Sequence, residues 1–373
     1  MAPKTIPLSA NRGRNGKGGP RQKKAGWSAK WSDELKIGKD ESAWIQITPG
    51  KYEGEDGNLQ SYYCAPMFKL QFQNKFGGTS WGYYRGNGGP DCTLQQCADS
   101  KNPNVEEPKY GAPNRFFVNV IHYGVYARTP LEKDGKPVTY ADGKLKGQPV
   151  YIWNEVKTVR EKRQLISNGD PEDVGFFRKK FLELPATQFK IIQEVAKKAR
   201  SMCKCGGTLF PSVFVCPECE GVLLDASESD MTDAEIANYG DQDIRCRHCG
   251  SVNFPRAEYD CDSCSDPRPH EYHEVAAKIK KVTGNNGYPS LAVDNVVSMR
   301  DHTFENKKPI VESEKEDGSF KYPEDIENLM KVQYDFETYT APKTNAEYSE
   351  LLGLREGDNG FVSNAKRYNN FRG

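Results

Sequence analysis

The sequence predicts a mainly β (α+β) protein with a small barrel, a helical segment and two four-cysteine units. Segments rich in aromatic and β-branched residues, with the alternation of strands, lie on both sides of the middle of the chain. After Pro171 the spacing of apolar residues changes from that of a strand to that of a helix. Eight of the eleven cysteines then form four close pairs between Cys203 and Cys264. The expected order is a basic tail, a barrel core, the cysteine units inserted before the last strands, and an acidic arm.

The composition limits the class of protein. At 373 residues the chain has room for two or three compact units. Its 52 Lys and Arg balance 52 Asp and Glu, and only 36% of residues are hydrophobic, so a sizeable part is expected in tails and loops. The sequence shows neither an apolar run of membrane-spanning length nor a signal peptide. A soluble, cytoplasmic protein with reduced cysteines is therefore expected.

The N-terminal segment is a polycation. Residues 1–32 contain eight Lys or Arg and no acid, among Gly, Pro, Ser and Asn. Such a composition cannot form a core, so residues 1–40 are predicted to be a disordered basic tail. Two roles stay open for it: neutralising phosphates, or solubilising the protein.

The barrel core is predicted over residues 41–200, with strand-like runs at 42–47, 61–72, 115–126 and 149–156. One face of these strands must fill the barrel, and several residues suit that face: Phe117, Val118, Val120, Ile152 and Val156. The other aromatic residues exceed what a small barrel can bury, and many stand beside Lys or Arg. Single-stranded nucleic acid binds such groups, because bases stack on the rings while the cations follow the phosphates. The alternative is that all of these rings are core.

The elements after the first strands are predicted in order. Two helices over 172–184 and 186–200, broken at Pro185, lead to the cysteines. A Lys-rich hairpin over 271–293 then closes the barrel within the unit 269–300. Residues 301–373 are expected to form an acidic, loosely ordered arm, because the stretch from Glu312 to Glu327 contains seven acidic residues and only two lysines.

The cysteines of residues 201–268 have the spacing of metal-binding turns. One pair has the form Cys-x-Cys and three have the form Cys-x-x-Cys. Two pairs supply a closed tetrahedral set of thiolates, which favours zinc, with an iron–sulfur centre as the alternative. Disulfides are disfavoured, because the pairs are too close and too regular. We predict two zinc ions per chain, in two ribbons formed in sequence or else in a cross-braced pair, held by Cys203, Cys205, Cys216, Cys219, Cys246, Cys249, Cys261 and Cys264.

Other cysteine and histidine residues are weaker metal ligands. His248 lies inside the third pair, where four cysteines are already available. Cys64, Cys92, Cys97 and His122 are candidates for a third site, but their irregular spacing favours ordinary buried thiols.

Catalytic motifs are absent from the sequence. It contains no paired-carboxylate metal motif, no nucleophile elbow and no phosphate-binding loop with Gly-Lys-Ser/Thr. The Gly-rich stretch at residues 86–90 ends in Pro90 and has no Lys. The protein is therefore expected not to be an enzyme.

Several short motifs occur in a distinctive order. A Trp-Ile-Gln-Ile strand at 44–47 ends in Pro-Gly, a Tyr-Tyr-Cys-Ala-Pro segment follows at 62–66, and an Arg-Phe-Phe-Val-Asn-Val strand lies at 115–120. Helices, a Lys-rich hairpin and an acidic region come after them. This order, over roughly residues 42–295, resembles the single-stranded-DNA-binding proteins of tailed bacteriophages, the helix-destabilising proteins of the T-even type.

The resemblance implies an OB-fold core that coats single strands during DNA replication, recombination and repair, in the host-cell cytoplasm. It also implies a basic N-terminus that promotes self-association along DNA, and an acidic arm that recruits replication or recombination proteins. Three features depart from the family, and one of them is a longer N-terminal tail. Its zinc site lies in the barrel region, with Cys and His ligands. The last residues here, 365–372, are basic.

The predicted DNA site consists of aromatic and basic residues of the barrel strands and the closing hairpin. They are Tyr62, Phe68, Lys69, Phe72, Trp81, Tyr83, Tyr84, Arg85, Arg115, Tyr123, Tyr126, Arg128, Trp153, Lys278, Lys280 and Lys281. Another class of protein remains open: a zinc-ribbon transcription or polymerase accessory factor that binds duplex DNA or protein.

Overall fold

The computed structural model describes most of the chain. The described residues are 5–7, 33–50, 52–53, 59–73, 78–88, 91–108, 114–141, 143, 145–168, 174–240, 242–283, 289–300, 310–316, 319–331 and 333–361. The predicted disorder of residues 1–40 falls mostly outside these ranges, but residues 33–40 are ordered, with Leu35 and Ile37 buried in the main core. No helix of the described ranges is long and apolar enough to cross a membrane.

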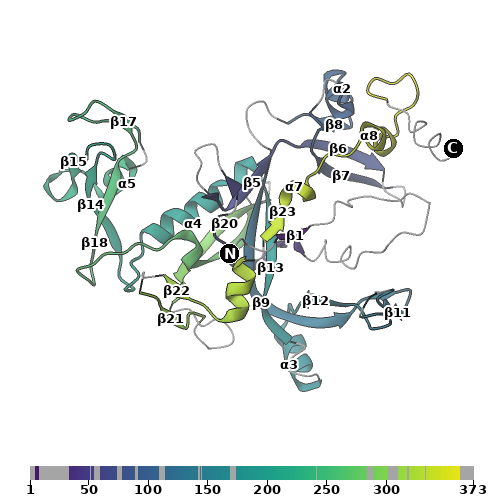
Figure 1. Ribbon diagram of the computed structural model, residues 1–373, viewed down its shortest axis with the longest axis horizontal. Helices are drawn as coiled ribbons and strands as arrows, with labels where there is room; N and C mark the ends of the chain where they lie inside the picture. The colour runs from purple at the N-terminus through teal and green to yellow at the C-terminus, as the bar shows by residue number, and fades with distance from the viewer. Residues whose placement is uncertain are drawn as a thin grey trace.

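A curled, half-barrel antiparallel sheet forms the centre of the molecule (Figure 1). Its strands are β2 (Ser42–Ile47), β5 (Tyr62–Ala65), β9 (Arg115–Pro130), β12 (Tyr151–Glu155), β13 (Val174–Pro185), β19 (Val275–Thr283) and β20 (Pro289–Ser298). The long strand β9 pairs with β13 along one edge. Along its other edge it pairs in turn with β5, β2 and β12. The predicted closing hairpin is confirmed as β19 and β20.

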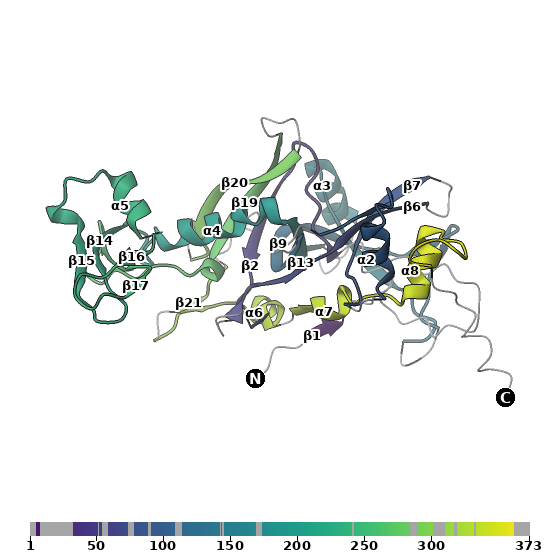
Figure 2. The same cartoon turned by 90° about the horizontal axis from the view of Figure 1, so that it is seen from above.

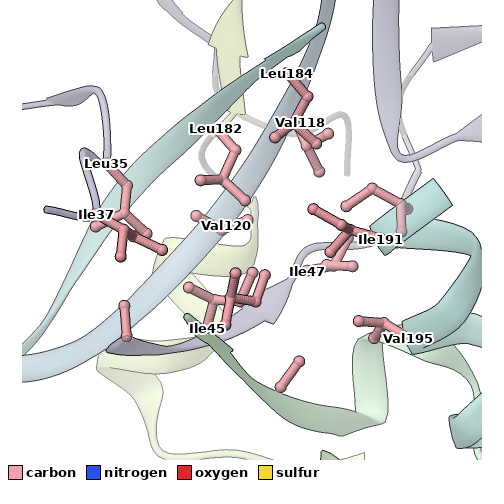
Figure 3. Close-up of a cluster of buried hydrophobic side chains, with 14 of the residues drawn as sticks. Leu35, Ile37, Ile45, Ile47, Val118, Val120, Leu182, Leu184, Ile191 and Val195 are labelled. Carbon is pink, nitrogen blue, oxygen red and sulfur yellow. The ribbon is translucent and has the colours of Figure 1, made fainter. Parts of the chain in front are cut away.

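The inner face of the sheet holds the main core (Figure 3). Alternate residues of the strands point into it, among them Ile45 and Ile47 of β2 and Val118 and Val120 of β9. Helix α4 (Lys190–Arg200) follows the 3-10 turn η2 (Ala186–Gln188) and covers this face with side chains at helical spacing. Its buried residues are Ile191, Ile192, Val195 and Ala199.

One of the two predicted helices is wrong. Residues 174–185 form strand β13 instead of a helix, and only the segment after Pro185 is helical. Both faces of β13 are covered, because Leu182 and Leu184 join the inner core while Phe181 packs on the outer side. A strand with apolar residues on both faces loses the alternation that marks a half-buried strand.

The C-terminal chain covers the outer face of the sheet (Figure 2). Its elements are β21 (Ser313–Glu314), β22 (Phe320–Lys321), α6 (Glu324–Lys331), β23 (Gln333–Asp335) and α7 (Phe336–Tyr339), and β23 pairs with β1 (Thr5–Pro7). Phe320, Ile326 and Phe336 are 3%, 1% and 0% exposed. The described part of the predicted loose arm is therefore packed, because its acids alternate with apolar residues that reach the sheet.

Smaller elements surround this centre. A satellite sheet of β6 (Phe68–Gln73), β7 (Thr79–Tyr84) and β8 (Val105–Glu106) packs with α2 (Thr93–Asp99) and α8 (Asn345–Leu352). The remaining short elements are β3 (Tyr52–Glu53), β4 (Leu59–Gln60), β10 (Glu132–Lys133), β11 (Lys136–Pro137) and α3 (Val159–Asn168).

The cysteine lobe, residues 201–268, projects from one end of the sheet (Figures 1 and 2). It lies between α4 and β19, as the insertion predicted from the sequence requires. Its elements are β14 (Leu209–Val215), β15 (Val222–Asp225), η3 (Ala226–Glu228), α5 (Asp233–Tyr239), β16 (Ile244–Arg245), β17 (Val252–Asn253) and β18 (Arg256–Cys261), and the 3-10 turn η4 (Tyr272–Glu274) follows it.

Candidate metal centres and nucleic-acid interface

The eight predicted ligands form two four-cysteine clusters, but their pairing differs from both expected arrangements. Cys203 and Cys205 join Cys261 and Cys264, while the second and third pairs form the other cluster: Cys216, Cys219, Cys246 and Cys249. The pairs are therefore nested, with the first beside the fourth and the second beside the third. Neither ribbons in sequence nor a cross-brace is formed.

The pairing of β14 with β18 explains this arrangement. β14 runs from the first cysteine pair to the second, and β18 runs back from the third pair to the fourth. Their register places Leu209 opposite Cys261 at one end and Val215 opposite Arg256 at the other. An antiparallel ribbon therefore brings the outer pairs together at one end and the inner pairs together at the other.

The sulfur geometry fits a tetrahedral metal ion. The Sγ atoms of Cys203 and Cys264 lie 3.6 Å apart, and those of Cys205 and Cys261 lie 3.4 Å apart. In the second cluster, Cys216–Cys249 is 3.7 Å and Cys219–Cys246 is 3.6 Å. Four thiolates at about 2.3 Å from one ion would be about 3.8 Å apart. Each cluster can thus enclose one metal ion.

The turns that carry the ligands also suit thiolates. In the second and third pairs, Glu220 and Gly250 have φ of 57° and 77° and donate their N–H groups to the carbonyls of Cys216 and Cys246. This closes each turn. Backbone N–H groups donate to sulfur, for example from His248 to Cys246 at 3.3 Å. Such bonds stabilise the negative charge of a ligating thiolate.

The weaker metal candidates lie elsewhere. His248 Nε2 lies 3.2 Å from the carbonyl oxygen of Val222, outside both clusters. Among the described residues, Cys64, Cys92, Cys97 and His122 form no metal-binding group. Cys92 and Cys97 are buried in the core beneath the satellite sheet, as ordinary thiols.

The predicted DNA-site residues separate into groups in the structure. Phe68, Tyr84, Tyr123 and Tyr126 are buried, and Tyr62, Phe72 and Tyr83 pack at the margins of cores. Because these seven rings pack within or against hydrophobic cores, none of them is kept in the interface considered below. The residues that remain are Lys69, Trp81, Arg85, Arg115, Arg128, Trp153, Lys278, Lys280 and Lys281.

A row of stacked cations and rings lies where β12 meets β9. The Arg178 guanidinium lies over the Trp153 ring at 3.4 Å, and that of Arg128 over the Tyr151 ring at 4.0 Å. Trp153 is directly opposite Arg128 in the pairing of β12 with β9. Tyr151 is 41% exposed. We call these four residues the cation–aromatic ladder.

The sequence interpretation found only half of this ladder. Trp153 and Arg128 were predicted, whereas Arg178 and Tyr151 were missed. Arg178 lay in a segment interpreted as a helix, and its place beside Trp153 requires the pairing of β13 with β9. Tyr151 had a detectable signal, because it lies two residues before Trp153 and so shares its strand face.

Similar pairs occur on the satellite sheet. Arg115 lies over the ring of Tyr83 at 3.4 Å, and Lys69 over that of Trp81 at 4.7 Å. Trp81 is 53% exposed. Lys69 also forms an ion pair with Glu106 at 2.7 Å, and the hydrogen bond in that pair raises the pKa of the lysine.

The lysines of the closing hairpin are partly neutralised. Lys278 and Lys280 both form ion pairs with Asp294 on the neighbouring strand. The backbone of Lys281 donates to the carbonyl of Glu41, whose carboxylate pairs with Lys157. The hairpin therefore contributes less free positive charge than its sequence indicates.

Beside the ladder lies a buried polar group. His122 is 2% exposed, and its Nδ1 contacts the Tyr126 hydroxyl. Burial, with a smaller effect of Lys180, lowers the pKa of His122 to about 3. Burial also lowers the pKa of Arg178 to about 10, so this guanidinium stays charged at neutral pH. The ladder therefore carries the charged Arg178 beside the exposed Arg128.

No protein-family model, curated protein or solved structure matches the chain. The function must therefore be inferred from the site itself.

Proposed function

We propose that the protein binds single-stranded DNA and coats strands exposed during replication, recombination and repair, without acting as an enzyme. The cation–aromatic ladder carries this proposal. Its rings and guanidinium groups alternate on one face of neighbouring strands, and part of the face is exposed. Bases stack on such rings for about 1–3 kcal/mol each, while guanidinium groups bind the phosphates between them.

The strand order supports an OB-type barrel for the same chain. The main strands follow one another along the chain in the order β2, β9, β13, β19, β20. Across the sheet their order is β13, β9, β2, β19, β20. Helix α4 lies in the chain between β13 and β19, which are the third and fourth of these strands in chain order. OB-folds bind oligonucleotides on their second and third strands. The ladder stands on β9 and β13, and on β12 between them in the chain.

Structural zinc fits the two clusters. Zinc is proposed for each of them, because the all-thiolate set is closed and leaves no position for a substrate. Its role would be to hold the cysteine lobe together, since Met202 is the one lobe residue, among those described, that packs against the four main hydrophobic clusters. Elemental analysis of protein purified without chelator should give two equivalents of zinc. Less than one equivalent would contradict this assignment, and iron would select the iron–sulfur alternative.

The acidic part of the C-terminal chain is the proposed contact for replication or recombination proteins. Its apolar residues are buried in the sheet, as Phe320 and Ile326 show. Its acids face outward and form an exposed set: Glu312, Glu314, Glu316, Glu324 and Asp325. A basic partner surface can therefore bind without unfolding this segment.

Binding to oligonucleotides tests the main proposal. Affinity for single strands of mixed sequence should exceed affinity for the matching duplex. The logarithm of the affinity should also fall linearly with the logarithm of the salt concentration, with a slope of about −0.7 per contacted phosphate. Removing residues 1–32 should flatten the slope and weaken filling of long strands more than binding to a short one. Failure of the intact protein to bind any single strand would end this proposal.

One observation favours a different function, that of an accessory factor which binds protein. The cysteine lobe has 13 acidic and 5 basic residues, a net charge of −8. It also exposes Val252 and Phe254, which are 58% and 60% accessible. Exposed apolar groups on a charged surface are typical of protein contacts. Binding to a duplex promoter or a polymerase, with no preference for single strands, would select this function.

A further inference from the structure

Helix α3 carries a concentrated positive charge beside the cation–aromatic ladder. Among its described side chains are three cations, Arg160, Lys162 and Arg163, and one acid, Glu161. Both arginines are exposed. Three residues separate the helix from the end of β12, the strand that carries Trp153 (Figure 1). Neither the DNA site predicted from the sequence nor the ladder includes a residue of α3.

The acid of this helix serves as a cap. The carboxylate of Glu161 accepts a hydrogen bond from the backbone N–H of Thr158 at 3.1 Å, and the Thr158 hydroxyl accepts one from the backbone N–H of Glu161 at 3.1 Å. This reciprocal arrangement is a capping box, which satisfies N–H groups at the start of a helix. Among the described residues, Arg160 and Arg163 have no carboxylate partner. Their positive charge therefore faces solvent.

The third cation of α3 joins the helix to the strand of Arg178. The Nζ atom of Lys162 lies 5.5 Å from the centroid of the Phe176 ring. Phe176 stands where the pairing of β13 with β9 shifts in register, between Gly175 and Phe177, and two positions before Arg178. The stacking of cations on rings, which defines the ladder, therefore continues from β13 onto α3.

The two arginines share one side of the helix, because they lie three positions apart. Guanidinium groups bind phosphates through paired hydrogen bonds. Seven residues of chain, at most about 25 Å, lead from Trp153 to Arg160. Since each nucleotide adds about 3.4 Å or more, a strand that leaves Trp153 reaches Arg160 within about seven nucleotides. One bound strand can therefore contact the ladder and α3 together.

We infer that α3 extends the nucleic-acid interface, with Arg160 and Arg163 as phosphate contacts for the strand that leaves the ladder. This inference rests on the proposed binding of single-stranded DNA. Two exposed guanidinium groups stand on a helix that contacts the ladder's own strand, and this arrangement carries the inference. Contacts to phosphate position a strand without reading its bases, so α3 adds affinity for strands of any sequence.

The Arg160→Gln/Arg163→Gln double variant tests this inference in the full-length, metal-loaded protein. Glutamine keeps a polar side chain of helical propensity close to that of arginine and removes the charge. Affinity for single strands of mixed sequence is measured by fluorescence anisotropy over a range of salt concentrations. The slope of log affinity against log salt should be shallower by about 1.4 in the variant, about 0.7 for each lost phosphate contact. At low salt the affinity should fall severalfold.

Helix α4 supplies a control that is matched in charge. The Lys190→Gln/Arg200→Gln variant also removes two positive charges, from residues that are exposed and have no carboxylate partner among those described. Helix α4 lies away from α3 in both views (Figures 1 and 2). This variant should keep the slope of the parent. An equal decrease of slope in both variants would overturn the inference, because the lower net charge would then account for it.

The length of the oligonucleotide provides a second measurement. Single OB-folds cover from about 4 to about 16 nucleotides. A strand of about four nucleotides spans only the ladder, so the α3 variant should bind it nearly as well as the parent does. The difference between the two proteins should grow as the strand lengthens toward about 16 nucleotides. A loss of the same size at every length would contradict a contact at α3, and circular dichroism checks that the helix is kept.

The same titrations separate this inference from the proposed function. If the parent and the α3 variant bind single strands with the same slope at every length, α3 is not part of the interface and the proposed function stands. If the parent binds no single strand, both proposals are wrong.

Discussion

The sulfur of Cys203 lies 3.6 Å from that of Cys264, although the two residues are 61 positions apart in the chain. This contact defines the nested clusters, and double variants can test it. Cys205→Ser with Cys264→Ser removes two ligands from one nested cluster and should leave one equivalent of zinc. Cys246→Ser with Cys264→Ser removes one ligand from each cluster and should leave none.

The opposite result would contradict the nested pairing. If the ribbons formed in sequence, the Cys246/Cys264 variant would keep one zinc and the Cys205/Cys264 variant would lose both. Metal content after gel filtration distinguishes the two patterns. Ser251→Ala, beside the second cluster but outside the ligand set, is the matched control and should keep both ions.

Removal of metal should unfold the cysteine lobe and leave the sheet folded. The lobe has few buried apolar residues besides its ligands, among them Leu209, Phe214 and Ile236. Metal binding and local folding are therefore one equilibrium. After treatment with chelator, limited proteolysis should cut within residues 201–268 first. Protection of the lobe equal to that of the sheet would show that metal does not hold it.

Replacing the rings of the ladder should weaken DNA binding without unfolding the protein. Trp153→Ala and Tyr151→Ala should each cost about 1–3 kcal/mol of affinity for single strands, because each removes a stacking surface. Tyr151→Phe keeps the ring face and should bind like the parent. Fluorescence anisotropy gives the affinities, and thermal unfolding checks the fold. Unchanged affinity in both alanine variants would remove the ladder from the site.

His122 should make the protein less stable in acid. Its folded-state pKa of about 3 lies below its ordinary value of 6.5, because burial disfavours the charged form. Between these values the unfolded chain binds the additional proton, so the free energy of unfolding falls as pH drops from 6.5 toward 3. The glutamine of the His122→Gln variant does not titrate, so the free energy of unfolding of this variant should fall less steeply with pH than that of the parent.

Urea unfolding at pH 7, 5.5 and 4.5, followed by tryptophan fluorescence, measures this difference. Loss of metal in acid affects both proteins, so only the difference between their slopes is interpreted. Parallel slopes would mean that His122 takes up its proton without unfolding.

The C-terminal chain should contribute directly to stability. Ile326 is 1% exposed and packs against the outer face of the sheet. Ile326→Ala should lower the free energy of unfolding by about 2–5 kcal/mol, through lost burial and the cavity that remains. Glu324→Ala, on the exposed side of the same helix, should change it by less than about 0.5 kcal/mol. Similar values for both variants in chemical denaturation would show that this segment is not docked in solution.

The sequence by itself determined the features that depend on neighbouring residues. Each cysteine pair with its turn, such as Cys246 to Gly250, is a local structure whose spacing is visible in the chain. The same holds for helix α4 after Pro185 and for the closing hairpin with its alternating Lys278 and Lys280. Their geometry follows from contacts within a few residues, so no knowledge of distant partners is needed.

Only the tertiary structure decided which distant segments meet. The pairing of β14 with β18 selected Cys264 as the neighbour of Cys203, and the pairing of β13 with β9 placed Arg178 on Trp153. Burial on both faces concealed the strand character of β13. The rings of Tyr123 and Tyr126 resemble that of Tyr151 in the sequence, yet only Tyr151 is exposed. Long-range pairing and the covering of each sheet face are cooperative properties of the whole chain, and short sequence patterns do not encode them separately.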